Sequence, residues 1–342
     1  MMLWTDLITP AELTGFARAA VEDVEREKAT LARWLPNTSV ADIVVKTVVS
    51  QDGNGALAQY RSFDAETPIG SGGKAERKVF ELLPLGLKER VSEYDQLRAR
   101  GDAALAMVLG GVQKAAKRVA NAVVDRLEVA RGQVLETGSL TIDENDVVQT
   151  VNFGRPAGNS VTAATLWSAN GAGPIADLIA WSDAYAAVNQ GRKPGAFLTS
   201  QRVVAALQRA EEIRALVATA VGGTPNIVSI DALNAALVAY RLPPIVIYDR
   251  KIRGVNVLSD DRVHLLPAAV DPNTGENELG ATFSGQTLEA SEPEYGIGDV
   301  DQPGLVVGAW KTKDPIGVWV HSNAISMPIM VNPVASMVAK VL

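Results

Sequence analysis

The sequence offers few residues of the types that carry catalysis. It contains two histidines, His264 and His321, and no cysteine. Neither histidine has a partner at metal-ligand spacing, so we expect both to be structural. The lack of cysteine excludes disulfides, thiolate catalysis and Cys-ligated zinc, and it is typical of proteins made in a reducing compartment.

A glycine-rich run at residues 70–74 superficially resembles a phosphate-binding loop. That pattern needs a glycine five residues before Gly73 and a serine or threonine after the lysine, where this chain has Pro68 and Ala75. The run also lies between two expected strands rather than between a strand and a helix. We interpret it as the flexible tip of a hairpin, and we expect nearby cationic side chains to contact an acidic surface.

The acidic clusters do not form a convincing site. Residues 143–146 are most simply a turn, and residues 299–301 lack the spaced ligands of a calcium loop. Neither a GxSxG elbow nor a GxGxxG fingerprint is present. We therefore predict no catalytic residue, no metal, no cofactor and no enzymatic activity. The competing hypothesis is a hydrolase that uses Asp or Glu, which predicts a small oligomer with paired acids in a pocket.

The composition further restricts the class of protein to which this chain can belong. The chain has 342 residues, of which 47% are hydrophobic and 5% aromatic, so a core of Ala, Val, Leu and Ile in two or more lobes is expected. We find no apolar run long enough for a membrane span and no signal-peptide pattern. The net charge of −7 argues against sequence-specific reading of nucleic acid.

One long helix organises the expected fold. Apolar residues recur every three or four positions over residues 102–137, which predicts a helix of roughly 45 Å that Gly138 ends. Its apolar face is made of Val and Ala, so we expect a sheet to pack closely against it. Gly110 and Gly111 favour a bend or a late start. The opposite face, expected to meet water or a polar neighbour, carries Gln113, Lys117, Asn121, Asp125 and Glu128.

Two segments are expected before this helix: a polar helix, followed by a group of strands. In the first, Thr9 and Glu12 form a capping-box pattern that begins a polar helix reaching about Lys28, with a thin apolar stripe that includes Phe16. In the second, we expect strands at 43–49, 57–63 and 76–82, with the glycine-rich tip between the last two. An isolated hairpin of this kind is marginally stable in water, so its stability should come from a neighbour.

A mixture of short helices and short strands is expected after the long helix. A hairpin is expected at 139–153, and short helices then alternate with short strands from about residue 160. The helices are expected at 177–190, 200–218 and 232–240, and the strands at 195–199, 242–248 and 262–267. Residues 273–303 are polar and glycine-rich and are expected to form a surface loop. The last strands, at 304–310, 317–320, 327–331 and 335–341, are expected to return to the long helix.

The order of these segments, together with several short motifs, resembles a known family. The motifs are RLE at 126–128, LETG at 135–138, VNFG at 151–154, Trp167, Asp177 with Leu178, GRKPGAFLTS at 191–200, LPPIVIYD at 242–249, LLP at 265–267 and MPIMVNP at 327–333. Each is weak alone. In this order and spacing, and over nearly the whole chain, they resemble the HK97-fold major capsid proteins of tailed phages. The resemblance is greatest to the lambda-type branch, the phage capsid E family.

The resemblance implies an α+β, HK97-like capsid fold with a defined division of the chain. Residues 1–41 are similar to the N-terminal arm, 42–88 to the E-loop region, 89–164 to the P-domain with its spine helix 102–137, 165–312 to the A-domain, and 313–342 to C-terminal strands that return to the P-domain. It implies that the protein self-assembles as hexamers and pentamers into the icosahedral head shell of a tailed phage. Virions would carry it, after assembly in the host bacterial cytoplasm.

The implied partners are other copies of the chain, a scaffolding protein, a portal, a decoration protein and packaged double-stranded DNA, which is bound without sequence readout; no membrane is involved. No long delta domain precedes the arm, which favours a separate scaffold. The runner-up hypothesis is an encapsulin-like compartment that packages protein cargo. Inter-subunit contacts are expected on the arm and the E-loop, at Glu12, Phe16, Arg61, Phe63, Lys74, Arg77 and Lys78.

Some members of the fold join their subunits through an E-loop lysine and an asparagine of a neighbour. This sequence has Lys74 and Lys78 on the E-loop and Asn332 near the C-terminus. The lambda-type branch is not generally cross-linked, and we expect no isopeptide bond here.

Overall fold

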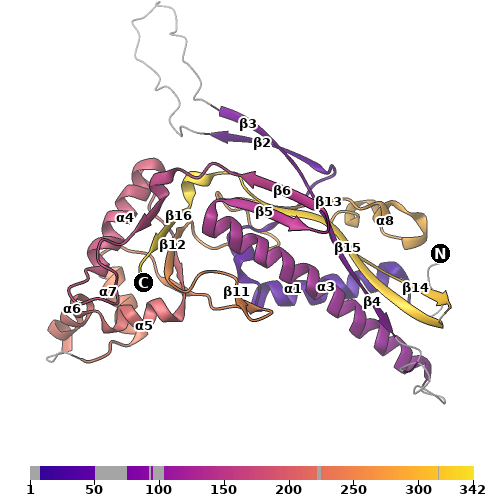
Figure 1. Ribbon diagram of the computed structural model, residues 1–342, viewed down its shortest axis with the longest axis horizontal. Helices are drawn as coiled ribbons and strands as arrows, with labels where there is room; N and C mark the ends of the chain where they lie inside the picture. Colours follow the sequence, from indigo (N-terminus) through magenta and orange to yellow (C-terminus); the bar gives the residue numbers. More distant parts are fainter. Residues whose placement is uncertain (1–7, 51–74, 92–93, 95–103, 222–224, 315) are drawn as a thin grey trace, which may run out of the picture.

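The computed structural model describes residues 8–50, 75–91, 94, 104–221, 225–314 and 316–342. The molecule is elongated, with a long helix and a sheet forming one end and a group of shorter helices around a second sheet forming the other (Figure 1). The predicted α+β class is confirmed.

The predicted spine is helix α3, Ala104–Thr137. It is one helix that runs through Gly110 and Gly111, so the glycines do not delay its start. Its small apolar side chains pack as expected, with Val112, Ala115 and Val119 fully buried. The helix ends at Gly138, whose φ of 70° is left-handed and whose N–H donates to the Val134 carbonyl at 2.9 Å.

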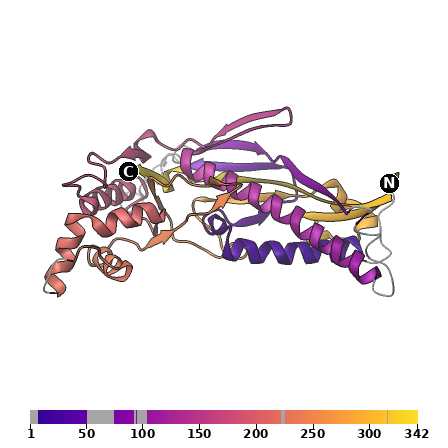
Figure 2. The same ribbon diagram turned by 60° about the horizontal axis from the view of Figure 1, so that its bottom comes forward.

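A mixed sheet, here called the spine sheet, packs against α3. Its members are β1 (Asn37–Ser39), β4 (Pro84–Val91), β13 (Gly280–Gly285), β14 (Val306–Lys313) and β15 (Ile316–Met330). The central strand is β15, which pairs antiparallel with β4, β13 and β14. Helix α1 (Pro10–Glu27) lies along α3 on the same side of this sheet (Figure 2).

Three features of the spine sheet differ from the sequence-based expectation. Strand β4 was not predicted, because Pro84 and Gly86 in its first half are typical of a turn. Strand β13 lies inside the expected surface loop, where Gly280 allows a close approach: a Cβ there would lie 2.2 Å from the Ile329 carbonyl oxygen. Strand β15 is continuous, whereas two separate strands were expected in its range.

The second sheet, here called the axial sheet, has the order β7-β16-β12-β8-β9. Its members are β7 (Ser160–Thr162), β8 (Ala196–Thr199), β9 (Ile245–Ile247), β12 (Arg262–Leu266) and β16 (Met337–Lys340). The expectation that every terminal strand returns to the spine is wrong for β16, which lies between β7 and β12. The reason is hydrophobic, since Met337 and Ala339 are buried in the core of this lobe.

Four helices surround the axial sheet: α4 (Pro174–Val188), α5 (Gln201–Arg209), α6 (Glu211–Val221) and α7 (Ile230–Ala239). Ser200 and Ser229 cap α5 and α7 through their side-chain oxygens. The single helix expected at 200–218 is instead two, because Ala210 leaves the helical region with ψ of 134°.

Two-stranded ribbons and one short helix complete the chain. The ribbons are β2 (Val44–Ser50) with β3 (Ala75–Glu81), β5 (Ser139–Glu144) with β6 (Val147–Asn152), and β10 (Lys251–Ile252) with β11 (Val255–Asn256). The β5–β6 turn was predicted, and Asn145 and Asp146 take the positive φ angles that tight hairpins favour. The strand expected at 57–63 lies outside the described residues. Helix α8 (Leu288–Ser291) follows β13.

Candidate assembly interface

The N-terminal arm helix is capped as its sequence predicts. The Thr9 Oγ1 accepts from the Glu12 N–H at 3.2 Å, and the Thr9 N–H donates to Glu12 Oε2 at 3.0 Å. These hydrogen bonds from Thr9 lower the pKa of Glu12. Glu12 therefore already serves its own helix. Phe16, the other arm residue expected at a contact, is 40% exposed, while its neighbours Leu13 and Ala17 are buried.

Polar contacts fasten the arm to its own subunit. Arg18 donates to the carbonyls of Leu305 at 2.8 Å, Asp301 at 2.8 Å and Pro303 at 3.2 Å. The Thr14 hydroxyl donates to the Val307 carbonyl at 3.1 Å and accepts from its N–H at 3.0 Å. The arm helix is thereby held against β14 and the segment before it, which leaves Phe16 on the outer side.

A buried ionic network joins the arm, the spine and both sheets. Arg131 of α3 is fully buried and bonds to Glu25 Oε1 of the arm at 3.0 Å, to Asn37 Oδ1 at 2.7 Å and to Thr282 Oγ1 of β13 at 2.9 Å. A second carboxylate, that of Glu128, lies 3.5 Å from the guanidinium. The network was not predicted. The available signal was a charged residue, Arg131, beside the apolar face of the spine.

The prediction that Glu128 lies on a solvated face of the spine is wrong. This residue is fully buried rather than solvated, and its Oε1 accepts from the Tyr248 hydroxyl at 2.7 Å and from the Leu31 N–H at 3.1 Å. Burial raises the pKa of Glu128 because it disfavours the charged form, while Arg131 opposes that shift. Burial and the neighbouring carboxylate also raise the pKa of Tyr248. Tyr248 follows β9, so this contact ties the axial lobe to the spine.

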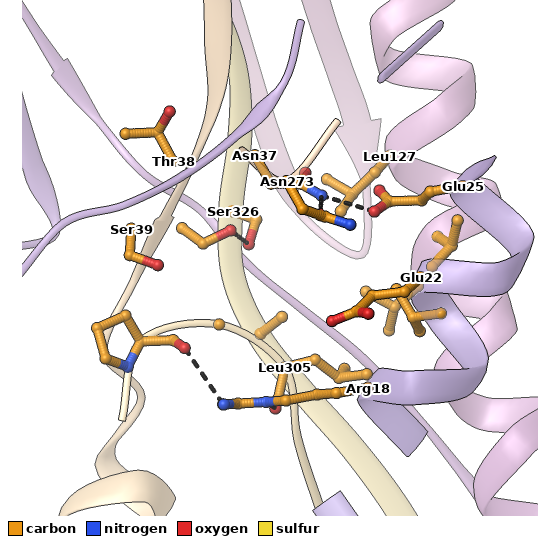
Figure 3. Close-up of a pocket in the computed structure, with 17 residues that line it drawn as sticks. Arg18, Glu22, Glu25, Asn37, Thr38, Ser39, Leu127, Asn273, Leu305 and Ser326 are labelled. Atoms are coloured by element: carbon orange, nitrogen blue, oxygen red, sulfur yellow. Dashed lines mark hydrogen bonds between the residues drawn. The ribbon is translucent and has the colours of Figure 1, made fainter. Parts of the chain in front are cut away.

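A cleft of about 180 Å³ lies between α1, α3 and the spine sheet (Figure 3). Its polar lining is already largely engaged: Arg18 binds the Pro303 carbonyl, Glu25 accepts from Asn37 at 2.6 Å, and the Ser326 and Ser284 hydroxyls lie 2.8 Å apart. The hydrolase hypothesis requires two acids that share a site. Glu22 and Glu25 both line the cleft, but Glu25 belongs to the network of Arg131.

The base of the E-loop ribbon rests on the β5–β6 end of the spine. Phe80 is buried and its ring centroid lies 5.6 Å from that of Phe153. The Lys78 ammonium donates to the Phe153 carbonyl at 3.3 Å, so this lysine contacts its own subunit. Arg77 is exposed, and Val79 is 60% exposed. The other predicted contact residues of the E-loop, Arg61, Phe63 and Lys74, lie outside the described residues.

The two histidines pack among other side chains of the subunit. Burial lowers the pKa of His264 to about 4, although Glu136 opposes the shift. His321 packs edge-on against Trp310, with ring centroids 4.9 Å apart. Within the described ranges, no cluster of three or more His, Asp or Glu side chains could hold a metal ion, and no helix could cross a membrane.

Two solved structures share this architecture. A prophage protein from Escherichia coli CFT073, whose description is that of a capsid protein, superposes with a TM-score of 0.62 at 15% identity, covering 96% of this chain and 99% of that one. A phage-related protein from Bordetella bronchiseptica RB50 superposes with a TM-score of 0.56 at 14% identity, covering 96% and 94%. At these identities the likeness shows the fold. No curated protein matches the sequence.

The family follows from the sequence itself. The model of the phage major capsid protein E family matches residues 33–341, which include the spine and both sheets. The predicted resemblance is thereby confirmed: this chain is a phage major capsid protein and belongs to the phage major capsid protein E family.

Proposed function

We propose that copies of this major capsid protein assemble as hexamers and pentamers into the icosahedral head shell of a tailed, double-stranded DNA phage. The observation that carries the proposal is the family match over residues 33–341. The shape of the subunit supports it. The long helix and its sheet bear a ribbon, β2–β3, that extends from the body, and Val45 and Phe80 of this ribbon are buried (Figure 1).

The proposal also assigns a role in the shell to each range of the chain. Residues 1–41 serve as the arm, 42–88 as the E-loop region, 89–164 as the P-domain, 165–312 as the A-domain and 313–342 as the closing strands. The grouping is one of sequence ranges, because β13 and most of β14 lie within residues 165–312 and yet pair in the spine sheet. Among the predicted contact residues, Phe16 and Arg77 are exposed and available to a neighbour.

The proposed partners follow from this role. The shell would be assembled in the host bacterial cytoplasm around a scaffolding protein, filled with DNA through a portal and finished with a decoration protein. The role is structural rather than catalytic. The net charge of −7 is consistent with a container that holds DNA without binding it tightly.

Electron microscopy and sedimentation of the expressed chain, alone and with its candidate scaffold, test the proposal. We expect closed icosahedral shells or free hexamer and pentamer rings. A chain that stays monomeric in the presence of the scaffold would refute the proposal. It would favour the hydrolase hypothesis, for which Glu22 and Glu25 are the candidate acids. Shells isolated from an induced lysogen should contain DNA, whereas shells that contain a protein cargo and no DNA would favour the encapsulin-like alternative.

A further inference from the structure

The spine sheet has two faces with different surroundings. One face packs on α3 and α1 through buried residues such as Val307, Ala309 and Val320. Side chains alternate along a strand, so the residues between these belong to the opposite face. There Trp310 of β14 lies directly across from Trp319 of β15, and Lys88 of β4 lies across from His321.

Only part of this opposite face is covered by its own subunit. Glu289 of α8 accepts from Asn323 at 2.8 Å, and the Tyr295 ring lies edge-on to that of His321, with centroids 6.4 Å apart. Beyond this cover, Trp310 and Trp319 are partly exposed and Lys88 is exposed. Trp310 Nε1 is shielded from solvent and has no hydrogen-bond partner among the described residues.

The uncovered part, here called the tryptophan surface, consists of Lys88, Trp310 and Trp319. The Lys88 ammonium lies 5.4 Å from the ring centroid of Trp319, a cation–π arrangement that holds a positive charge above an aromatic plane. Partly exposed tryptophans of this kind are typical anchors of protein interfaces. Such a surface fits a partner that offers aliphatic side chains flanked by carboxylates.

The same chain carries a segment with that chemistry. From residue 263 to residue 310 it contains no lysine or arginine. Residues 286–302 of this stretch are here called the acidic loop. Two of its aliphatic side chains are largely exposed to solvent: Leu288 is 84% exposed and Val300 is 93% exposed. Their acidic neighbours are Glu289, Glu292, Glu294, Asp299 and Asp301.

We propose that the acidic loop of one subunit docks on the tryptophan surface of the next subunit. The inference rests on the proposed function, and it names one contact through which the copies join. The exposure of Leu288 and Val300 shows that these two side chains do not pack on the tryptophan surface of their own subunit. We place this contact in a heterologous, head-to-tail arrangement, which is the arrangement that a closed ring of subunits requires. Opposite charges fix its register.

Cross-linking between two single-cysteine variants tests the contact, because the chain has no native cysteine. Val300→Cys labels the acidic loop, and Thr312→Cys, at a half-buried residue two positions from Trp310 and on the same face of β14, labels the edge of the tryptophan surface. The variants are mixed, assembled with unmodified chain, and treated with a short bismaleimide. We expect a covalent dimer from the mixture and none from either variant alone. Val238→Cys on α7, 65% exposed, replaces Val300→Cys in the matched control and should give no dimer.

A charge reversal adds a second readout. Lys88→Glu in the Thr312→Cys chain should lower the yield of dimer severalfold, and Glu292→Lys in the Val300→Cys chain should restore part of it. Shells that form normally without the dimer, or a dimer from Val300→Cys alone, would overturn this contact and leave the proposed function standing. If the unmodified chain forms neither shells nor capsomer rings, the proposed function fails and the contact with it.

Discussion

Replacing Arg131 by methionine tests the buried ionic network. Arg131→Met keeps an unbranched, flexible side chain that fills much of the same space and removes the only cation within hydrogen-bonding distance of Glu25 among the described residues. Two buried carboxylates, Glu25 at 2% and Glu128 at 0% exposure, then lose their cationic partner. Breaking a buried ion pair from one side costs about 3 to 5 kcal/mol of stability. We therefore expect a severely destabilised subunit that still folds at low temperature.

The magnitude can be converted to a melting temperature. Unfolding entropy is about 2.1 cal/mol/K per residue, so a chain of 342 residues has roughly 0.7 kcal/mol/K at its midpoint. The expected loss then lowers Tm by about 4 to 7 °C. Circular dichroism of the unassembled subunit measures it, and urea unfolding gives an independent free energy. A loss below about 1 kcal/mol would show that the pair contributes little and would refute this account.

A matched control separates charge from packing. Glu25→Gln and Glu128→Gln added to Arg131→Met remove the buried charges together, which is often neutral or stabilising. We expect this triple variant to recover most of the lost stability. If it is no more stable than Arg131→Met, the loss comes from packing and the electrostatic explanation is wrong.

The pH dependence gives a further check with a definite sign. Arg131 lowers the pKa of Glu128, so its removal raises a pKa that burial already holds above 4.5. The folded state then binds a proton more tightly than the unfolded state, and stability falls as pH rises above the unfolded value. The deficit of Arg131→Met relative to wild type should therefore shrink as pH is lowered from about 8 toward 5.

Other substitutions test other parts of the argument. Val123→Asp places a charge on the buried face of the spine, where Val123 is 4% exposed, and should abolish soluble folded protein in an expression trial; wild-type thermal stability would refute the face assignment. Deletion of residues 64–73 should leave a folded subunit, by circular dichroism, that forms no closed shells; normal shells in the microscope would contradict the E-loop role. Alanine at both Lys74 and Lys78 should leave the band pattern on denaturing gels unchanged, whereas loss of a high-mass ladder would reveal a cross-link.

Periodicity and capping chemistry made much of the fold predictable. The spine, the capped arm helix and the β5–β6 turn are each specified by residues close in sequence: the Val and Ala spacing in 102–137, the pair Thr9 and Glu12, and the polar residues 143–146. Strands β4 and β13 were missed for the opposite reason. Their Pro84, Gly86 and Gly280 favour turns locally, and only long-range pairing with β15 makes strands of them.

The candidate interface was less predictable than the fold. Exposed Phe16 and Arg77 were identified by residue type, whereas Lys78 proved to bond within its own subunit. The partners of Arg131 come from residues more than ninety positions away, Glu25 and Asn37, so no local pattern could have indicated them. By contrast, the tryptophan surface is local in sequence, because the consecutive strands β14 and β15 place Trp310 opposite Trp319, nine positions later.

The position of β16 in the axial sheet bears on the order of events during synthesis. This strand lies between β7 and β12, with Val338 opposite both Ser160 and His264, so an inner strand of the sheet comes from residues translated after both of its neighbours. The axial sheet therefore cannot close until β13, β14 and β15 of the spine sheet have been translated, and pairings this distant form slowly. Consequently the axial sheet can be completed only once residues 337–340 have been made.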